Sequence, residues 1–239
     1  MTWQNDYRKR FYDPARGFKN GTEEFHELIA AAVPRGSEIL EIGAGPSNRT
    51  SRFLATIGAV HGLDPDAAVK ANDALASASI LDGDRYPFDD ERFDACVSNY
   101  CIEHIPDPRA HLAEVVRVLR PGGAYVLRTP NRWHYVSLVS SLTPHWVHHL
   151  LANRLRNLGD EDHDPYPTVY AMNTQAAVER LAARSGLTVE TLRMVEKEPS
   201  YGMSLRALFV AFMAYERAVN ATDRAAVLRS NIFAVLRKP

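Results

Sequence analysis

The chain has 239 residues, of which 46% are hydrophobic and 24% are charged, so it is long enough to bury the core of a soluble globular domain. Its formal net charge of -1 argues against nucleic acid as a partner, because binding to phosphates needs a basic surface. The N-terminus has no apolar signal core, and the longest apolar run, around residues 207–214, is too short to span a bilayer. We therefore expect a cytoplasmic protein without a membrane span.

Strand-like and helix-like patterns alternate along most of the chain, which predicts a parallel sheet covered by helices on both faces. The expected strands are residues 38–42, 58–64, 79–82, 93–99, 124–128, 187–195 and 231–236. The expected helices are residues 22–33, a segment that begins near Asn48, a segment from Pro108 to a stop at Pro121, residues 173–185 with Asn173 as N-cap, and about 203–219.

Two stretches depart from this alternation. Residues 131–172 are too long for an ordinary connection and contain an amphipathic helical pattern near residues 147–158, so we interpret them as an insertion over the active site. Residues 1–21 are rich in aromatic and basic side chains and are either an arm that folds over the substrate or a partly disordered tail. The remaining domain is expected to span residues 22–239.

The end of the first expected strand, from Glu41 to Gly45, is the most informative stretch. Gly43 and Gly45 allow positive φ and a close approach of a ligand to the backbone, as in a nucleotide-binding turn. A dinucleotide motif would place a third glycine at position 48, which is asparagine here, and Glu41 would repel a diphosphate. S-adenosylmethionine has no phosphate and carries an ammonium and a sulfonium, so charge favours it. A turn without a ligand remains the alternative.

Polar residues also follow the next expected strands. Asp64 stands about twenty residues after Gly45, where an acid reaches ribose hydroxyls, although it could instead cap a helix. Asp82 with Gly83 could bind the amino edge of adenine or form a plain turn, and Asn99 ends the fourth strand. Because the carboxyl ends of parallel strands meet at one edge of a sheet, these side chains could converge there.

These pieces occur in the order seen in the class I S-adenosylmethionine-dependent methyltransferases of the small bacterial group called type 11, which the chain resembles over roughly residues 36–130. The resemblance implies an α/β fold with a Rossmann-like, mostly parallel sheet of about seven strands, the last antiparallel, plus a helical lid insertion. The cofactor-binding residues that we expect on this basis are Glu41, Gly43, Ala44, Gly45, Asp64, Pro65, Asp82, Gly83, Asp84, Asn99 and Tyr100. Ser47 departs from the pattern, since the family commonly has its third glycine there.

Methyl transfer from a sulfonium mainly needs alignment and exclusion of water, and a base is required only for acceptors such as alcohols. His104 and His134 are the candidate bases, although a histidine at position 104 could instead serve in packing. The histidines and acids between residues 145 and 164 fit no compact zinc spacing, so we expect no metal.

We therefore expect a methyltransferase that uses S-adenosylmethionine to methylate a small molecule, at oxygen rather than at nitrogen or carbon. The preference for oxygen comes from the histidines and from a likeness of residues 129–131 and 164–174 to enzymes of saccharide or secondary-metabolite biosynthesis. A monomer or a homodimer is expected, and the apolar segment near residues 205–219 could form a dimer face. An N- or C-methyltransferase, a non-catalytic cofactor-binding regulator and, less favoured, an NAD-dependent oxidoreductase remain as alternatives.

Overall fold

A computed structural model describes residues 3–142, 167–199 and 205–239. The chain divides into two compact units. The core unit comprises Phe25–Pro130, Thr168–Arg193 and Ile232–Pro239, and the accessory unit comprises Met1–Glu24, Asn131–Pro167 and Met194–Asn231. The amphipathic helix expected near residues 147–158 lies outside the described residues, and the placement of the insertion over the active site stays a prediction.

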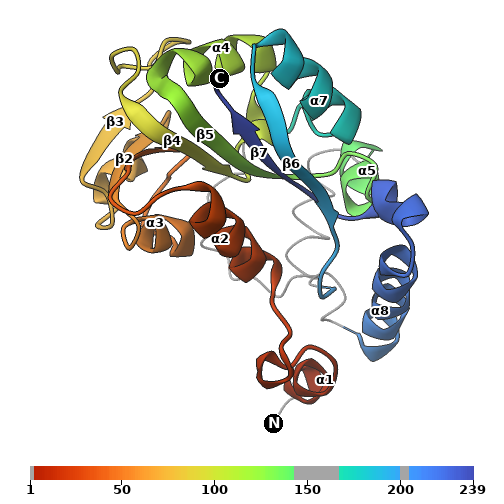
Figure 1. Ribbon diagram of the computed structural model, residues 1–239. Helices are drawn as coiled ribbons and strands as arrows, with labels where there is room; N and C mark the ends of the chain where they lie inside the picture. The colour runs from red at the N-terminus through yellow and green to blue at the C-terminus, as the bar shows by residue number, and fades with distance from the viewer. Residues whose placement is uncertain (1–2, 143–166, 200–204) are drawn as a thin grey trace. The chain divides into compact units, whose positions relative to one another are not determined.

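A seven-stranded sheet in the order β3-β2-β1-β4-β5-β7-β6 organises the fold (Figure 1). The strands are β1 (Glu38–Ile42), β2 (Ala59–Asp64), β3 (Ser77–Ile80), β4 (Phe93–Asn99), β5 (Leu119–Pro130), β6 (Thr188–Val195) and β7 (Asn231–Arg237). β1 pairs in parallel with β2 and β4, β2 with β3, and β4 with β5. The order reverses between β1 and β4, which is where ligands bind in open sheets of this kind.

Backbone hydrogen bonds at one end of β5 fix the direction of β7. The Gly122 N–H donates to the Lys238 carbonyl at 2.9 Å, and the Lys238 N–H donates to the Gly123 carbonyl at 3.0 Å. The start of β5 therefore lies beside the end of β7, so the two strands are antiparallel. The sheet is mixed and mostly parallel, which confirms the expected fold class.

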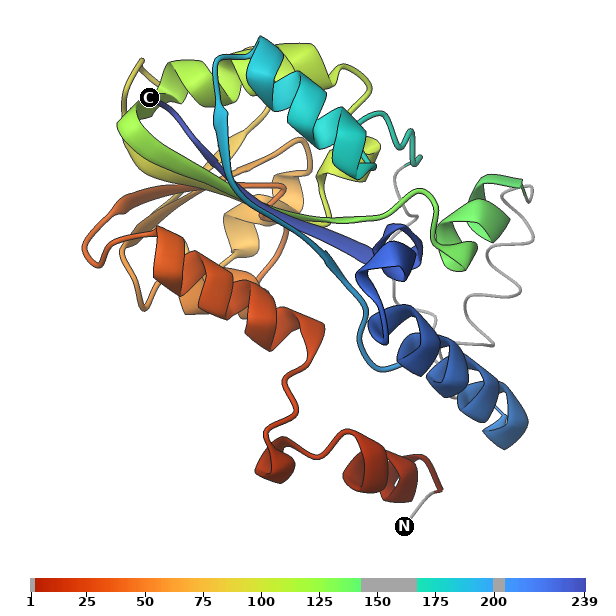
Figure 2. The ribbon, with the colours of Figure 1, turned by 45° about the vertical axis from the view of Figure 1, so that its right-hand side comes forward.

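Helices cover both faces of the sheet (Figures 1 and 2). One face carries α2 (Gly21–Ala32) and α3 (Arg49–Leu54), and the other carries α4 (Pro108–Val118) and α7 (Gln175–Arg184). A strand that is covered on both sides reads as a nearly continuous apolar run. Leu40, Val97 and Val126 at the centres of β1, β4 and β5 are fully buried, as this rule requires.

Three element boundaries predicted from the sequence are wrong. The N-cap of α7 is Thr174, whose hydroxyl accepts from the Ala177 N–H at 3.2 Å, because the Asn173 side chain is turned into the protein. β3 covers residues 77–80 instead of 79–82, since its pairing with β2 begins at Ser77. β5 begins at Leu119 instead of residue 124, because the Gly122 segment pairs with the end of β7.

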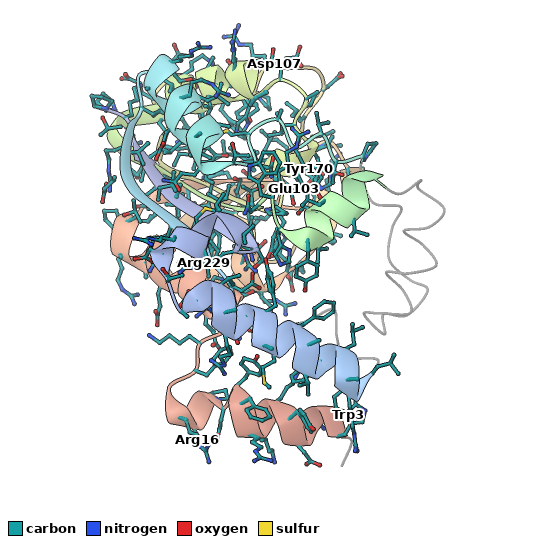
Figure 3. The ribbon with its side chains drawn as sticks, turned by 90° about the vertical axis from the view of Figure 1, so that its right-hand side faces the viewer. Trp3, Arg16, Glu103, Asp107, Tyr170 and Arg229 are labelled. Carbon is teal, nitrogen blue, oxygen red and sulfur yellow. The ribbon has the colours of Figure 1, made fainter. Side chains whose placement is uncertain are left out.

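The accessory unit is helical in its described part. Its elements are α1 (Trp3–Phe11), a 3-10 turn (Pro14–Arg16), α5 (Tyr135–Leu142), α8 (Arg206–Asn220) and a second 3-10 turn (Asp223–Leu228). Figure 3 shows α1 lying alongside α8. The rings of Trp3, Tyr7 and Tyr12 meet Phe209 of α8 edge-on, with centroids 5.6 to 6.2 Å apart. None of the described helices is long and apolar enough to cross a membrane.

Candidate active site

The turn after β1 needs its two glycines for different reasons. Gly43 has φ of 74°, and a Cβ added there would lie 2.7 Å from the Cys101 Cβ, so a side chain is excluded by space as well as by conformation. Gly45 has φ of 53°, but a Cβ there would meet nothing within 4 Å. The backbone conformation alone therefore favours glycine at position 45.

Glu41 is a buried carboxylate just before this turn. The residue is 3% exposed, and burial raises its pKa to about 7, while a hydrogen bond from Ser51 opposes the rise and the Asp64 charge adds to it. Its Oε2 atom has no hydrogen-bond partner among the residues that the structure describes. A buried carboxylate is costly unless a charge or a donor meets it, so this oxygen is suited to a cationic ligand.

Asp64 links the glycine turn to the end of β2. Its Oδ2 accepts from the Gly45 N–H at 3.0 Å and its Oδ1 accepts from the Asp66 N–H at 2.8 Å. Asp66 is the N-cap of the following 3-10 turn, so the alternative of Asp64 as that cap is wrong. The Pro65 side chain between them is exposed.

The Asp82 turn lies beside Asp64, because the Leu81 N–H donates to the Asp64 carbonyl at 2.9 Å. Asp82, Gly83 and Asp84 are exposed, and Gly83 has φ of 80°. The two acids therefore follow the same sheet edge as Asp64, and contact with adenine stays a prediction.

Asn99 and Tyr100 end β4 next to β1. The Asn99 Nδ2 donates to the Thr50 hydroxyl at 3.0 Å, and its Oδ1 finds no partner in the described part of the chain. Tyr100 has φ of 55°, which is uncommon for a bulky residue. Arg128 fixes it twice, because its carbonyl accepts from the Tyr100 N–H at 2.9 Å and its guanidinium donates to the Tyr100 hydroxyl at 2.5 Å.

The two candidate bases belong to different units. His104 is half-buried in a short 3-10 turn (Ile102–His104) of the core unit. His134 belongs to the accessory unit, is 4% exposed, and has its Nε2 3.5 Å from the Glu196 Oε2. Burial lowers the pKa of His134 to about 4 and raises that of Glu196 to about 7.

Sequence reasoning missed a buried polar network at the end of β5. The Thr129 hydroxyl donates to the Glu103 carboxylate at 3.0 Å, and the Asn173 Nδ2 donates to the Thr129 hydroxyl at 2.6 Å. The N–H groups of Val169 and Tyr170 donate to the Glu103 carbonyl, and Figure 3 shows Glu103 and Tyr170 side by side. Thr129 and Asn173 both lie in the segments that resemble biosynthetic enzymes, so that likeness was the available signal.

The start of α3 is occupied by its own chain. The Asn48 Oδ1 accepts from the N–H groups of Thr50 and Ser51 at 2.8 and 3.0 Å, and its Nδ2 donates to the Ala44 carbonyl at 2.8 Å. Those N–H groups are the ones that hold a pyrophosphate in a dinucleotide fold. Ser47, at the position of the missing glycine, is hydrogen-bonded to Asp73. The turn therefore lacks the donors that an NAD-dependent oxidoreductase would need there.

No cluster of histidine, cysteine, aspartate and glutamate in the described ranges could hold a metal ion. The histidines and acids between residues 145 and 164 lie in the part of the chain that is not described.

Comparison with known protein families agrees with this geometry. Residues 40–127 match the family described as Methyltransferase domain. An uncharacterized methyltransferase of Anoxybacillus flavithermus is 26% identical over 148 residues, which are 58% of this chain and 70% of that protein. One of Mycobacterium sp. (strain JLS) is 31% identical over 137 residues, and the chain spans only 53% of its length.

Solved structures share the fold at low sequence identity. A putative methyltransferase from Bacillus halodurans superposes with a TM-score of 0.54 at 15% identity, over 90% of this chain and 99% of that one. A SAM-dependent methyltransferase from Methanosarcina mazei gives 0.56 at 16% identity, over 88% and 96%. At these identities the likeness concerns the fold alone.

Proposed function

We propose that the chain is an S-adenosylmethionine-dependent methyltransferase, in line with the match of residues 40–127 to the Methyltransferase domain family, and that it methylates an oxygen atom of a small molecule. The observation that carries the proposal is the glycine turn with a buried, incompletely bonded carboxylate beside it and a capped helix after it. The cofactor supplies a methyl group on a sulfonium, which an acceptor displaces in line.

Each end of the cofactor has a suitable partner in the core unit. Glu41 would hold the methionine ammonium, and Asp64 would accept from the ribose hydroxyls with the lone pairs that its two backbone contacts leave. The turn from Asp82 to Asp84 would contact adenine. Tyr100, fixed by Arg128, would border the reacting end.

An alcohol acceptor must lose a proton as it attacks, so the proposal includes a base. His134 is one candidate, and burial, which lowers its pKa to about 4, keeps its imidazole neutral at physiological pH but makes it a weak base. The neighbouring Glu196 would stabilise the imidazolium that forms. His104 is the second candidate, and its neighbour Glu103 is also a carboxylate.

The acceptor would be a saccharide or secondary-metabolite intermediate with a free hydroxyl. This part rests on the likeness of residues 129–131 and 164–174 to such biosynthetic enzymes and on the near-zero net charge, which suits a small molecule better than nucleic acid.

The test begins with thermal-shift titration of the purified protein. We expect stabilisation by S-adenosylhomocysteine and none by NADH, and the reverse result would contradict the proposal. Hydroxylated small molecules are then incubated with cofactor labelled in its methyl group. Label in an ester or ether that Asp64→Ala abolishes would support O-methylation, whereas label on nitrogen or carbon would assign a different acceptor atom.

A further inference from the structure

Two adjacent hydroxyl side chains on α3 reach into the cofactor site from the same helical turn. Thr50 and Ser51 are 2% and 0% exposed, and neither belongs to the glycine motif. Each contacts a residue at the carboxyl end of a different strand of the sheet. Threonine and serine inside a helix need a reason, because their hydroxyls compete with the helical backbone for hydrogen bonds.

Ser51 stands in a chain of hydrogen bonds that ends on Glu41. The Asn72 Nδ2 donates to the Ser51 hydroxyl at 3.0 Å, and the same amide donates to the Gly45 carbonyl at 3.2 Å. A hydroxyl has one proton to give, so a Ser51 that accepts from Asn72 directs its own proton to Glu41. This contact occupies one carboxylate oxygen and leaves Oε2 as the oxygen without a partner in the described ranges.

Thr50 occupies one polar atom of the Asn99 side chain in a similar way. The Asn99 Nδ2 donates to the Thr50 hydroxyl, and Oδ1 is the oxygen left over in the described ranges. When the His26 Nε2 carries no proton, the Thr50 hydroxyl gives its single proton to His26 and can only accept from Asn99, which selects this amide orientation. His26 of α2 holds the other side of this hydroxyl, with its Nε2 at 3.4 Å, while its ring stacks on Phe53 at a centroid distance of 4.1 Å.

The sheet brings the two remaining oxygens to one face. Glu41 of β1 is paired with Val97 of β4, and Asn99 lies two residues further along β4. Side chains two residues apart on a strand point to the same face, so Glu41 and Asn99 lie on the same face at adjacent strand ends. Both remaining atoms are hydrogen-bond acceptors, and the pair suits a group that is cationic and has several N–H donors.

We propose that Thr50 and Ser51 are positioning residues of the cofactor site, which turn the Asn99 Oδ1 and the Glu41 Oε2 toward the ammonium of the methionine part. The inference rests on the proposed function, because the ammonium belongs to the cofactor. It adds two residues from outside the glycine motif and gives them separate tasks. Ser51 prepares a charged acceptor, and Thr50 prepares a neutral one.

The separate tasks give the test a readout that a packing defect would not produce. The probe is S-adenosylhomocysteine, which keeps the ammonium, and its Kd is measured by calorimetry from pH 5.5 to 8.5. Glu41 must be ionised to hold the ammonium, so affinity rises as pH passes about 7. Asp64 of β2 is the other ionisable group that acts on Glu41. The Cys101 thiol lies beside Gly43, and burial raises its pKa to about 12, so it does not titrate in this range. The ammonium of S-adenosylhomocysteine has a pKa of about 8, and its titration is the same for every variant.

Ser51→Ala removes a hydrogen bond that favours the ionised carboxylate, so we expect about tenfold weaker binding at pH 7 and an upward shift of the pH midpoint. Thr50→Val frees the Asn99 amide, so we expect about fivefold weaker binding with an unchanged midpoint. Thr56→Val is the matched control, because that hydroxyl is bonded to the Phe53 carbonyl at the exposed end of the helix, and it should bind like wild type.

The conservative variants Ser51→Thr and Thr50→Ser keep the hydroxyl and should restore most of the affinity. A wild-type protein that does not bind S-adenosylhomocysteine would overturn the proposed function itself. A wild-type protein that binds, together with a Ser51→Ala variant whose midpoint does not move, would overturn only the positioning role. The positioning role would also be overturned if Ser51→Thr bound no better than Ser51→Ala, or Thr50→Ser no better than Thr50→Val.

Discussion

The core unit and the accessory unit fix their buried polar groups in different ways. In the core unit, Glu41, Asp64 and Asn99 stand at the ends of neighbouring strands, and hydrogen bonds from the glycine turn and α3 orient them. In the accessory unit, side-chain pairs join segments that are much further apart in the sequence, such as the buried pair Tyr12 with Glu216 and the half-buried pair Lys197 with Glu24. The first kind of site follows from strand order, whereas the second depends on how separate segments assemble.

This difference separates the two halves of the proposed reaction. The cofactor contacts belong to a scaffold whose polar positions are set by the sheet. His134, one of the two candidate bases, belongs to a unit assembled from three stretches of chain, whereas His104 belongs to the core unit. We therefore expect variants in the core unit to change cofactor affinity, and variants in the accessory unit to change turnover or stability while cofactor affinity is kept.

The largest expected effect is that of Gly43→Val. The new side chain would collide with Cys101 and force a β-branched residue to positive φ, so binding of S-adenosylhomocysteine should fall below detection in calorimetry. Gly36→Ala is the control, since Gly36 also has positive φ but a Cβ there meets nothing within 4 Å. It should lose about 1 kcal/mol of stability and keep its affinity. Equal binding by both variants would contradict a cofactor site at this turn.

His134→Gln should come next, with about a hundredfold slower methylation of an alcohol acceptor at saturating cofactor. The imidazole is neutral above pH of about 5, while Glu196 ionises near pH 7 and can then stabilise the imidazolium. The difference in rate between wild type and variant should therefore grow as pH rises through about 7. The same loss in His104→Gln, with His134→Gln active, would move the base to the core unit.

Glu41→Gln should weaken S-adenosylhomocysteine binding on the order of thirtyfold at pH 8, because the amide carries no charge for the ammonium. In the ligand-free protein, the same substitution should increase the free energy of unfolding at pH 8. A carboxyl whose folded pKa is raised stabilises the fold below its ordinary pKa and loses that contribution as pH rises through about 7. The variant should thus be more stable than wild type at pH 8, by at most about 3 kcal/mol, and equal to it at pH 4. Chemical denaturation at both pH values measures this.

The smallest expected effect is that of Tyr12→Phe in the accessory unit. The ring keeps its contacts with Phe18 and Phe209, but the hydrogen bond of 3.1 Å to Glu216 is lost. The free energy of unfolding should fall by about 1 kcal/mol, with cofactor affinity unchanged. A large loss of affinity for S-adenosylhomocysteine would contradict the expectation that variants in the accessory unit keep cofactor binding.

The parts that sequence could predict are those with local causes. β1 and β4 have the expected bounds because an apolar run ends there at a glycine or a polar residue. Glu41, Asp64 and Asn99 lie at the ends of neighbouring strands as expected, because strand ends in a parallel sheet share one edge, and their contact with the cofactor stays a prediction. Asn48 was expected to begin a helix, and it does so as the N-cap.

The parts that sequence could not predict depend on which atoms meet in space. Nothing in the pattern of Thr50 and Ser51 distinguishes hydroxyls that orient ligand groups from hydroxyls on an ordinary helix. Asn173 and Thr174 are both good N-caps, and only the buried contact of Asn173 with Thr129 decides between them. The pairing of His134 with Glu196 joins residues from two distant segments, so no local spacing indicates it.

The capped start of α3 has a consequence for selection among metabolites. Adenosine is common to many abundant compounds, and contacts with adenine and ribose cannot tell S-adenosylmethionine from ATP or NAD. The proposed contact of Glu41 with the ammonium is one source of the distinction, and the absence of a phosphate site at the described start of α3 is another. Because Asn48 already accepts from the N–H groups of Thr50 and Ser51, a phosphate beside Glu41 would meet repulsion and would not find those two donors free. We therefore expect phosphorylated nucleotides to compete poorly with the cofactor, even in the absence of a methyl acceptor.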